Sequence, residues 1–191
     1  MKDIKVFLVI AIVVFSIFAL ITYSEHKKQE KFEEVVQDYN NFRFVKRSDM
    51  WWTDYKKGDT VFTIPFRYLP AEVENLSIGG NLTDFTMEKI KLTFSPEDNH
   101  NRFVALATAE LTISLKSVFR ADVEVGCTKT NEELCPNLPV IDCNSSGPVV
   151  LLRIAQEPKV ILDENCIIFE GNNTELVRGV DLFLYSIMGI I

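Results

Sequence analysis

Histidine is nearly absent from this chain, which has only His26 and His100 among its 191 residues. The sequence also has no Cys-x-x-Cys motif. Zinc sites use histidine and closely spaced cysteine as ligands, and nucleophilic triads use histidine as the general base. The predicted strand-to-helix turn at residues 94–98 lacks the glycines that cradle a phosphate. We therefore expect no metal, no cofactor and no enzymatic activity.

Basic residues are also in the minority, because 20 lysines and arginines face 27 aspartates and glutamates, for a net charge of −7. Lys2, Asp3 and Lys5 give residues 1–23 a charge of +1, which leaves −8 for the rest of the chain. An acidic body repels phosphate backbones and anionic lipid surfaces. Nucleic acid is therefore not an expected partner.

One long apolar run is present instead. Residues 6–23 carry no charge over 18 positions. At about 1.5 Å per helical residue the run would extend roughly 27 Å, close to the thickness of a bilayer's hydrocarbon core. We predict that residues 1–24 form a signal-anchor transmembrane helix that crosses the membrane once, with the lipid bilayer as the partner of residues 6–23.

Two other interpretations of this run stay open. Lys2 and Lys5 precede an apolar stretch that ends at the small residues Thr22 and Ser24, as in a cleaved signal peptide. The run is longer than the usual core of about 7–15 residues, however, and no Ala-x-Ala site follows it. The second interpretation is a pilin-type terminus that assembles into filaments, although the glycine-ended leader and the early glutamate of that type are missing.

Cysteines and glycosylation motifs indicate the direction of the anchor, because the lysines on its two sides are nearly balanced. The cysteines are an even set in the last third of the chain, which suits disulfides in an oxidising compartment: Cys127, Cys135, Cys143 and Cys166. Four Asn-x-Ser/Thr motifs for N-glycosylation begin at Asn75, Asn81, Asn144 and Asn172. Together they favour a cytoplasmic amino terminus and an extracytoplasmic body.

Residues 25–42 follow the anchor and are predicted to form a juxtamembrane helix or stalk. Their apolar side chains recur at helical spacing, at Phe32, Val35, Val36 and Tyr39. This narrow stripe would pack on the chain's own body or, alternatively, on a second copy. The remaining residues, 43–191, are long enough for one disulfide-containing α+β ectodomain.

The first part of this body is rich in aromatic residues. Trp51 and Trp52 are adjacent, and adjacent side chains of a strand point to opposite faces, so at most one of them enters the core. The other would form a surface contact. Residues 59–68 alternate as a half-buried strand, and Pro65 places that strand at a sheet edge because proline cannot donate to a ladder. Residues 69–86 are predicted to form an irregular, solvated stretch with at most one short strand.

A strand-helix-strand unit is predicted next. Residues 90–94 form the first strand, and Ser95 with Pro96 begins a helix that continues to about residue 118. Residues 119–126 return as a strand. A unit of this length is expected to be a parallel βαβ crossover in a mixed sheet.

The last part of the body combines a buried sheet with a helix. Residues 149–154 are apolar on both faces and predict a central strand, and residues 159–162 and 166–169 predict a hairpin. A helix over residues 174–188 closes the predicted fold, with its apolar face inward and Asp181 among the outward-facing charges.

Four cysteines allow three disulfide pairings. We favour Cys127 with Cys135, which closes a short loop, and Cys143 with Cys166, which joins two predicted strands. Each closure would contribute on the order of 3 kcal/mol in the chain-entropy model.

A surface hydrolase is the remaining enzymatic hypothesis. Asp142, Asp163 and Asp181 lie near predicted strand or helix ends, and a buried pair of carboxylates can act as general acid and base. His100, in a polar Asn-His-Asn segment, is the one histidine within the body. Carboxylates that are simply exposed to solvent are much commoner than buried catalytic pairs, so we rank the hydrolase hypothesis below a binding role.

Several segments from about residue 51 onward carry a resemblance: FTIPFRYLPAEVENLSI, LTFSPED, CPNLPVIDC, and NCIIFEG with LVRGVDLFLYSIMGI. They resemble a group of uncharacterised single-pass surface proteins of archaea. The resemblance covers most of the body and implies an extracytoplasmic location. That group has no assigned reaction to transfer to any residue of this chain.

These observations lead to one expected function and one alternative. We expect a membrane-anchored binding or structural module of the cell envelope that contacts a protein partner or a second copy of itself. The alternative is a pilin-like or membrane-complex subunit that assembles through residues 6–42.

Overall fold

The computed structural model describes residues 12–23, 35–83, 85–98 and 101–191. The chain divides into two compact units, Met1–Val35 and Val36–Ile191. In the first unit the described residues 12–23 are helical. Within the described ranges, no helix has both the length and the apolar character that a membrane crossing requires. Residues 1–11 and 24 of the predicted anchor and residues 25–34 of the predicted stalk lie outside the described residues.

The second unit begins with a four-stranded antiparallel sheet in the order β1-β2-β3-β4. Its strands are β1 (Val36–Tyr39), β2 (Phe42–Arg47), β3 (Met50–Lys57) and β4 (Thr60–Phe66). Each strand pairs with the next across a two-residue turn. As predicted, β4 with Pro65 is an edge strand. The sequence predicted one mixed sheet, and this separate meander forms because such short turns make each strand pair with its neighbour in sequence.

The predicted stalk helix is wrong over residues 36–42. Val36 and Tyr39 belong to β1, where they pair with Val45 and Phe42 of β2. The turn between the strands is Asn40-Asn41, and both residues have positive φ angles, of 44° and 67°. Two positive φ angles in a two-residue loop define the turn that suits a hairpin's twist, and asparagine tolerates them well. The apolar spacing matched a helix, but this turn overrides it.

A six-stranded mixed sheet forms the other side of the unit, in the order β5-β9-β10-β8-β6-β7. Its strands are β5 (Ser77–Leu82), β6 (Lys89–Phe94), β7 (Asp122–Cys127), β8 (Val149–Ile154), β9 (Lys159–Glu164) and β10 (Cys166–Gly171). The predicted βαβ unit is confirmed, because β6 and β7 pair in parallel. The predicted hairpin and central strand are also confirmed, since β9 pairs antiparallel with β10 and β8 lies inside the sheet.

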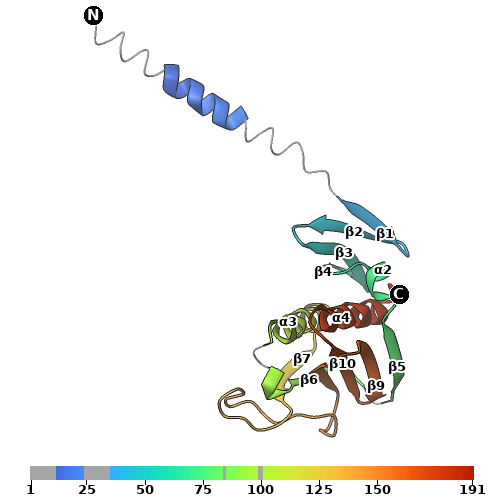
Figure 1. Cartoon of the computed structure of the whole chain (residues 1–191). Coiled ribbons are helices and arrows are strands. Elements are labelled where there is room, and N and C mark those ends of the chain that lie inside the picture. The colour runs from blue at the N-terminus through green and yellow to red at the C-terminus, as the bar shows by residue number, and fades with distance from the viewer. Residues whose placement is uncertain (1–11, 24–34, 84, 99–100) are drawn as a thin grey trace, which may run out of the picture. The chain divides into compact units, whose positions relative to one another are not determined.

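Two long helices lie between the sheets, as Figure 1 shows: α3 (Arg102–Ser117) and α4 (Thr174–Ile187). A short helix, α2 (Pro70–Val73), follows the first sheet. Tyr185 of α4 is fully buried, with its ring 4.2 Å from that of Phe66 and 5.9 Å from that of Phe44. Its hydroxyl donates a hydrogen bond to the Tyr68 carbonyl at 2.6 Å. The α4 helix thereby connects the inner face of the first sheet to the core of the second.

The start of α3 differs from the predicted one. Pro96–Asp98 form a single 3-10 turn, and α3 begins only at Arg102. Asn101 caps it, because its side-chain oxygen accepts a hydrogen bond from the Phe103 N–H at 2.9 Å. Ser95 was the predicted cap, and its hydroxyl instead donates to Glu97. A proline at the first helical position suits a short 3-10 turn as well as an α-helix, so the sequence pattern placed the cap of α3 six residues too early.

Both disulfides have the favoured pairing, Cys127 with Cys135 and Cys143 with Cys166. The second one fastens the loop before β8 to the first residue of β10. Ile141 of this loop packs with Val149 and Leu151 in a small core of its own. This cluster covers the sheet face opposite the helices, which explains why β8 is apolar on both sides.

Candidate functional site

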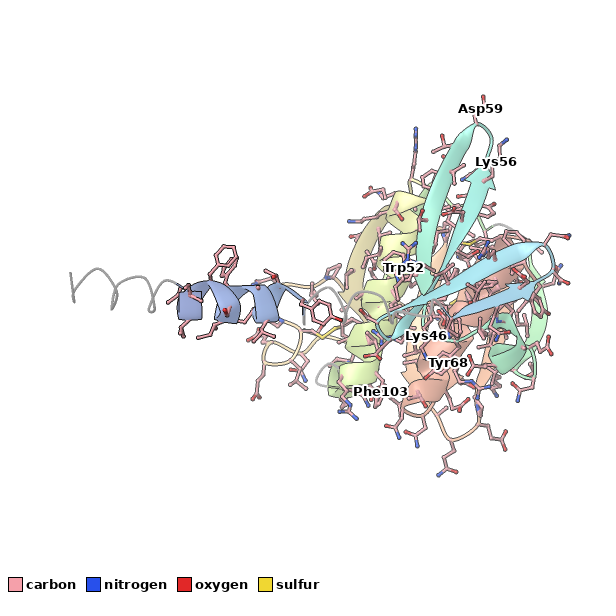
Figure 2. The ribbon with its side chains drawn as sticks, turned by 90° about the horizontal axis from the view of Figure 1, so that it is seen from above. Lys46, Trp52, Lys56, Asp59, Tyr68 and Phe103 are labelled. Carbon is pink, nitrogen blue, oxygen red and sulfur yellow. A yellow bond between two sulfur atoms is a disulfide. The ribbon has the colours of Figure 1, made fainter. Side chains whose placement is uncertain are left out.

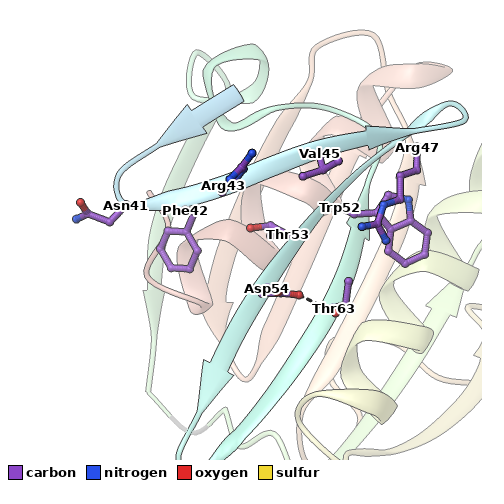
Figure 3. A pocket seen from close by; sticks show the side chains of 9 residues that line it. All are labelled: Asn41, Phe42, Arg43, Val45, Arg47, Trp52, Thr53, Asp54 and Thr63. Atoms are coloured by element: carbon purple, nitrogen blue, oxygen red, sulfur yellow. Dashed lines mark hydrogen bonds between the residues drawn. The ribbon is translucent and has the colours of Figure 1, made fainter. Parts of the chain in front are cut away.

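A pocket of about 290 Å³ lies on the four-stranded sheet. Side chains of β2, β3 and β4 and the β1–β2 turn form its walls (Figure 3). We call it the arginine pocket, and its lining residues are Asn41, Phe42, Arg43, Val45, Arg47, Trp52, Thr53, Asp54 and Thr63.

The alternation of the strands explains why polar side chains gather there. Val45 of β2 pairs with Trp52 of β3, and Asp54 of β3 pairs with Thr63 of β4. Directly opposed residues of antiparallel strands share a face. These four side chains therefore lie on the sheet's outer face, while the intervening positions supply core residues such as Phe44.

The pocket lining is positively charged within an acidic protein. Arg43 and Arg47 are exposed, and neither belongs to an ion pair among the described residues. Asp38 lies opposite Arg43 on β1 without forming such a pair. Asp54 is the one carboxylate in the lining, and its Oδ1 accepts a hydrogen bond from the Thr63 hydroxyl at 2.6 Å. The two guanidinium groups are therefore available to an anion from solvent.

The two tryptophans divide as predicted, because Trp51 is 9% exposed and belongs to the core whereas Trp52 lies in the pocket. Of the two predicted surface contacts, only Trp52 is placed to make one. Its indole Nε1 is buried and has no hydrogen-bond partner in the part of the chain that the structure describes. Leaving such a donor unpaired costs about 1–3 kcal/mol. The unpaired Nε1 is itself shielded from solvent, so Trp52 contributes to the pocket through its ring rather than through its N–H.

A second, more apolar groove of about 230 Å³ lies between β4 and α3. We call it the carboxylate groove because Asp181 and Glu110 both line it, together with Arg67. Its other walls are Met50, Pro65, Leu106, Ala109, Ile113, Ser114 and Leu184.

Asp181 was predicted to face outward, and this prediction is wrong, since the side chain is only 1% exposed. Its Oδ2 accepts hydrogen bonds from the backbone N–H groups of Arg67 and Tyr68, both at 3.0 Å. These residues follow the end of β4, where the ladder no longer supplies acceptors. Burial raises the pKa of Asp181 well above its ordinary value, and the nearby Glu110 charge raises it further.

Glu110 is joined to Arg67 by an ion pair of 2.5 Å between Oε1 and Nε. Its Oε2 is buried and has no hydrogen-bond partner among the described residues. Burial raises the pKa of the Glu110 carboxyl, although the Arg67 charge opposes that rise. Asp181 and its two N–H donors form an enclosed structural contact that holds α4 to the end of β4. We therefore interpret the carboxylate groove as a structural feature that stabilises the fold rather than as a catalytic site.

The acids of the hydrolase hypothesis are not brought together in one pocket. Asp142 holds its own loop, because its Oδ1 accepts a hydrogen bond from the Asn144 N–H at 3.0 Å. Asp163 is exposed near the end of β9. Neither residue lines the carboxylate groove with Asp181. His100 lies outside the described residues. In the described ranges, no group of three or more histidine, cysteine, aspartate or glutamate side chains is placed to hold a metal ion.

The four asparagines of the glycosylation motifs are all exposed, and all lie outside the four-stranded sheet. Asn75 follows α2, Asn81 lies in the edge strand β5, Asn144 lies in the disulfide-fastened loop, and Asn172 precedes α4. Asn75 is already engaged, since its Oδ1 accepts a hydrogen bond from Arg178 at 3.0 Å. None of these asparagines lines the arginine pocket.

The arginine pocket was missed by sequence reasoning. Arg43, Val45 and Arg47 alternate along β2, and Val45 pairs with Trp52 of β3. That these side chains meet on one face can be recognised only when the register of the two strands is known. Comparisons of the chain with protein-family models, with curated proteins and with solved structures found no match.

Proposed function

We propose that this chain is a binding module of the cell envelope, anchored in the membrane through residues 6–23 with its carboxyl-terminal body on the extracytoplasmic side. In this proposal the body binds its partner through the arginine pocket. The observation that carries the proposal is the pair of arginines on the exposed face of the first sheet, neither of which forms an ion pair with any residue that the structure describes.

Two further observations support the extracytoplasmic side. Disulfides persist in oxidising compartments, and this body holds two of them. The glycosylation motifs lie on exposed asparagines, and none of these asparagines lines the pocket. The uncharged run over residues 6–23 supports the anchor by its length and composition.

Location is tested by protease accessibility in right-side-out vesicles that contain the full chain. An antibody against the body follows its digestion before and after detergent is added. The proposal expects digestion without detergent, whereas a body that is cut only after detergent would overturn the extracytoplasmic location. A cytoplasmic protein of the same vesicles serves as the control for leakage.

Binding is tested by crosslinking in the same membranes, comparing the unchanged chain with the double variant Arg43→Gln/Arg47→Gln. The matched control is Lys56→Gln/Lys89→Gln, which removes the same charge outside the pocket. Lys56 lies near the far tip of the β3–β4 hairpin from Trp52, as Figure 2 shows, and Lys89 is exposed on β6. We expect only the arginine variant to lose its crosslinked neighbour. Equal capture by both variants would overturn the role of the pocket, and this result would favour the assembly hypothesis.

A further inference from the structure

We infer that the ligand of the arginine pocket is an oligosaccharide whose sugar units carry carboxylates, such as a chain of uronic acids. This inference rests on the proposed function, because it names the chemical class of ligand for the same site. It follows from the charge of the pocket, from its aromatic and hydroxyl-binding groups, and from its size.

The charge of the pocket selects an anion. Arginine binds a carboxylate through two parallel N–H···O bonds, and Arg43 and Arg47 have no such partner within the described structure. The chain as a whole is acidic, but at physiological salt the field of an exposed charge fades over about 8 Å. Within that range the lining carries two arginines against one carboxylate, Asp54, and Asp38 lies opposite Arg43 on β1. Acids elsewhere on the chain contribute little.

The spacing of the arginines favours a ligand with more than one carboxylate. Arg43 and Arg47 are four residues apart on β2, so their Cα atoms are separated by about 13 Å along the strand. They share one face of the sheet, because an even number of positions separates them. A chain with an acid group on each unit can bind both guanidinium groups at once, whereas a single small anion reaches only one without bending both side chains inward.

The remaining polar groups favour a sugar over an acidic peptide. Asp54 repels carboxylates, but it accepts hydrogen bonds from hydroxyl groups, as it already does from Thr63. Trp52 lines the pocket with an aromatic ring, and such a ring packs well against the apolar face of a sugar. An acidic peptide would bring carboxylates near Asp54 and would supply few hydroxyl groups.

The volume of the pocket fits one sugar unit with its neighbours outside. At about 290 Å³ it lies at the lower limit for pockets that bind small molecules. The rest of an oligosaccharide would extend along the outer face of the sheet, where none of the four glycosylation motifs lies.

The test uses isothermal titration calorimetry on the full chain in detergent micelles. The probe is trigalacturonate, with its methyl ester as an uncharged probe of the same sugar and triglutamate as a peptide that carries carboxylates. We expect trigalacturonate to bind at least tenfold more tightly than either other probe. Arg43→Gln/Arg47→Gln should weaken its binding at least tenfold, and Lys56→Gln/Lys89→Gln should leave it within twofold.

A further variant, Trp52→Ala, separates charge from sugar recognition, because it removes the aromatic ring and keeps both arginines. We expect it to weaken trigalacturonate binding several-fold, and circular dichroism would check that the variant folds. Triglutamate binding equal to that of trigalacturonate would overturn the inference, and so would binding that the arginine substitutions leave unchanged.

The outcomes also separate this inference from the proposed function. If crosslinking depends on the two arginines but none of the carbohydrate probes binds, the module keeps its role and the ligand class is wrong. If the body proves shielded from protease, the proposed location fails, while calorimetry on the purified chain still decides the ligand class.

Discussion

Asp181 makes the stability of this fold depend on pH. Its carboxyl is buried, and its pKa is raised well above the ordinary value of 3.8. A raised pKa means that the folded state holds the proton more tightly than the unfolded state does. The contribution of Asp181 to stability is therefore fully present below pH 3.8 and is lost as the pH rises through the folded-state pKa.

The substitution Asp181→Asn removes this dependence and keeps the acceptor. The amide oxygen can receive the two backbone hydrogen bonds now made to Oδ2, from Arg67 and Tyr68. Between the unfolded and folded pKa values, the unchanged protein should lose about 1.4 kcal/mol of unfolding free energy per pH unit relative to the asparagine variant. Glu110 also titrates with a raised pKa, but it is present in both proteins, so the difference between them isolates Asp181 and its coupling to Glu110.

The assay is urea unfolding followed by tryptophan fluorescence at four pH values from 4 to 7. Asp181→Ala serves as the control, because it leaves both backbone N–H groups without an acceptor. Each unpaired group costs about 1–3 kcal/mol, so the alanine variant should be less stable than the asparagine variant at every pH. Parallel pH profiles for the unchanged protein and Asp181→Asn would refute the reasoning, since they would show that the carboxyl titrates normally in the fold.

Three further predictions concern single elements of the fold, each measured by urea unfolding. Replacing Cys143 and Cys166 by serine opens a loop with a sequence separation of 23, and should lower the unfolding free energy by about 3 kcal/mol; an unchanged midpoint would contradict this. Gly80→Ala should destabilise the fold by more than about 1 kcal/mol, because φ is +96° and a Cβ would lie 1.9 Å from a carbonyl oxygen of β9. Gly79→Ala is its control, since no atom lies within 4 Å of its Cβ position, and similar losses in both would refute the steric argument. Tyr185→Phe should cost about 1 kcal/mol through the lost 2.6 Å hydrogen bond while keeping the ring packing, and the near-ultraviolet circular dichroism should stay unchanged.

Much of the second half of the fold follows from local sequence. The strands on either side of α3 were predictable because apolar strands border a helix too long to be a turn, and parallel pairing then follows from the length of the crossover. The pairing of Cys143 with Cys166 was predictable because it joins two predicted strands, β8 through the loop before it and β10 through its first residue. Pro65 marked the edge strand through its missing N–H.

The features that the sequence did not predict have a common physical cause, which is contact between segments far apart in the chain. Asp181 has an ordinary sequence context, and only the end of β4, 114 residues earlier, gives its carboxylate a partner. The arginine pocket depends on the register of β2 against β3, which hydrophobic spacing does not determine for strands with a polar outer face. Asn40-Asn41 is the exception, because a local turn signal was present there and was outweighed by a helical spacing.

The position of α4 between the sheets imposes an order on folding. The first sheet lies near the start of the body, yet its inner face is covered by a helix that is synthesised much later, as the contact of Phe44 with Tyr185 illustrates. Local hairpins form in microseconds, so β1 to β4 can pair early and then expose an apolar face while the rest of the chain is still emerging. Exposed apolar surface of that kind is prone to aggregation. A nascent chain of this protein therefore passes through a stage in which it needs protection, and that stage ends only when the segment containing Tyr185 arrives.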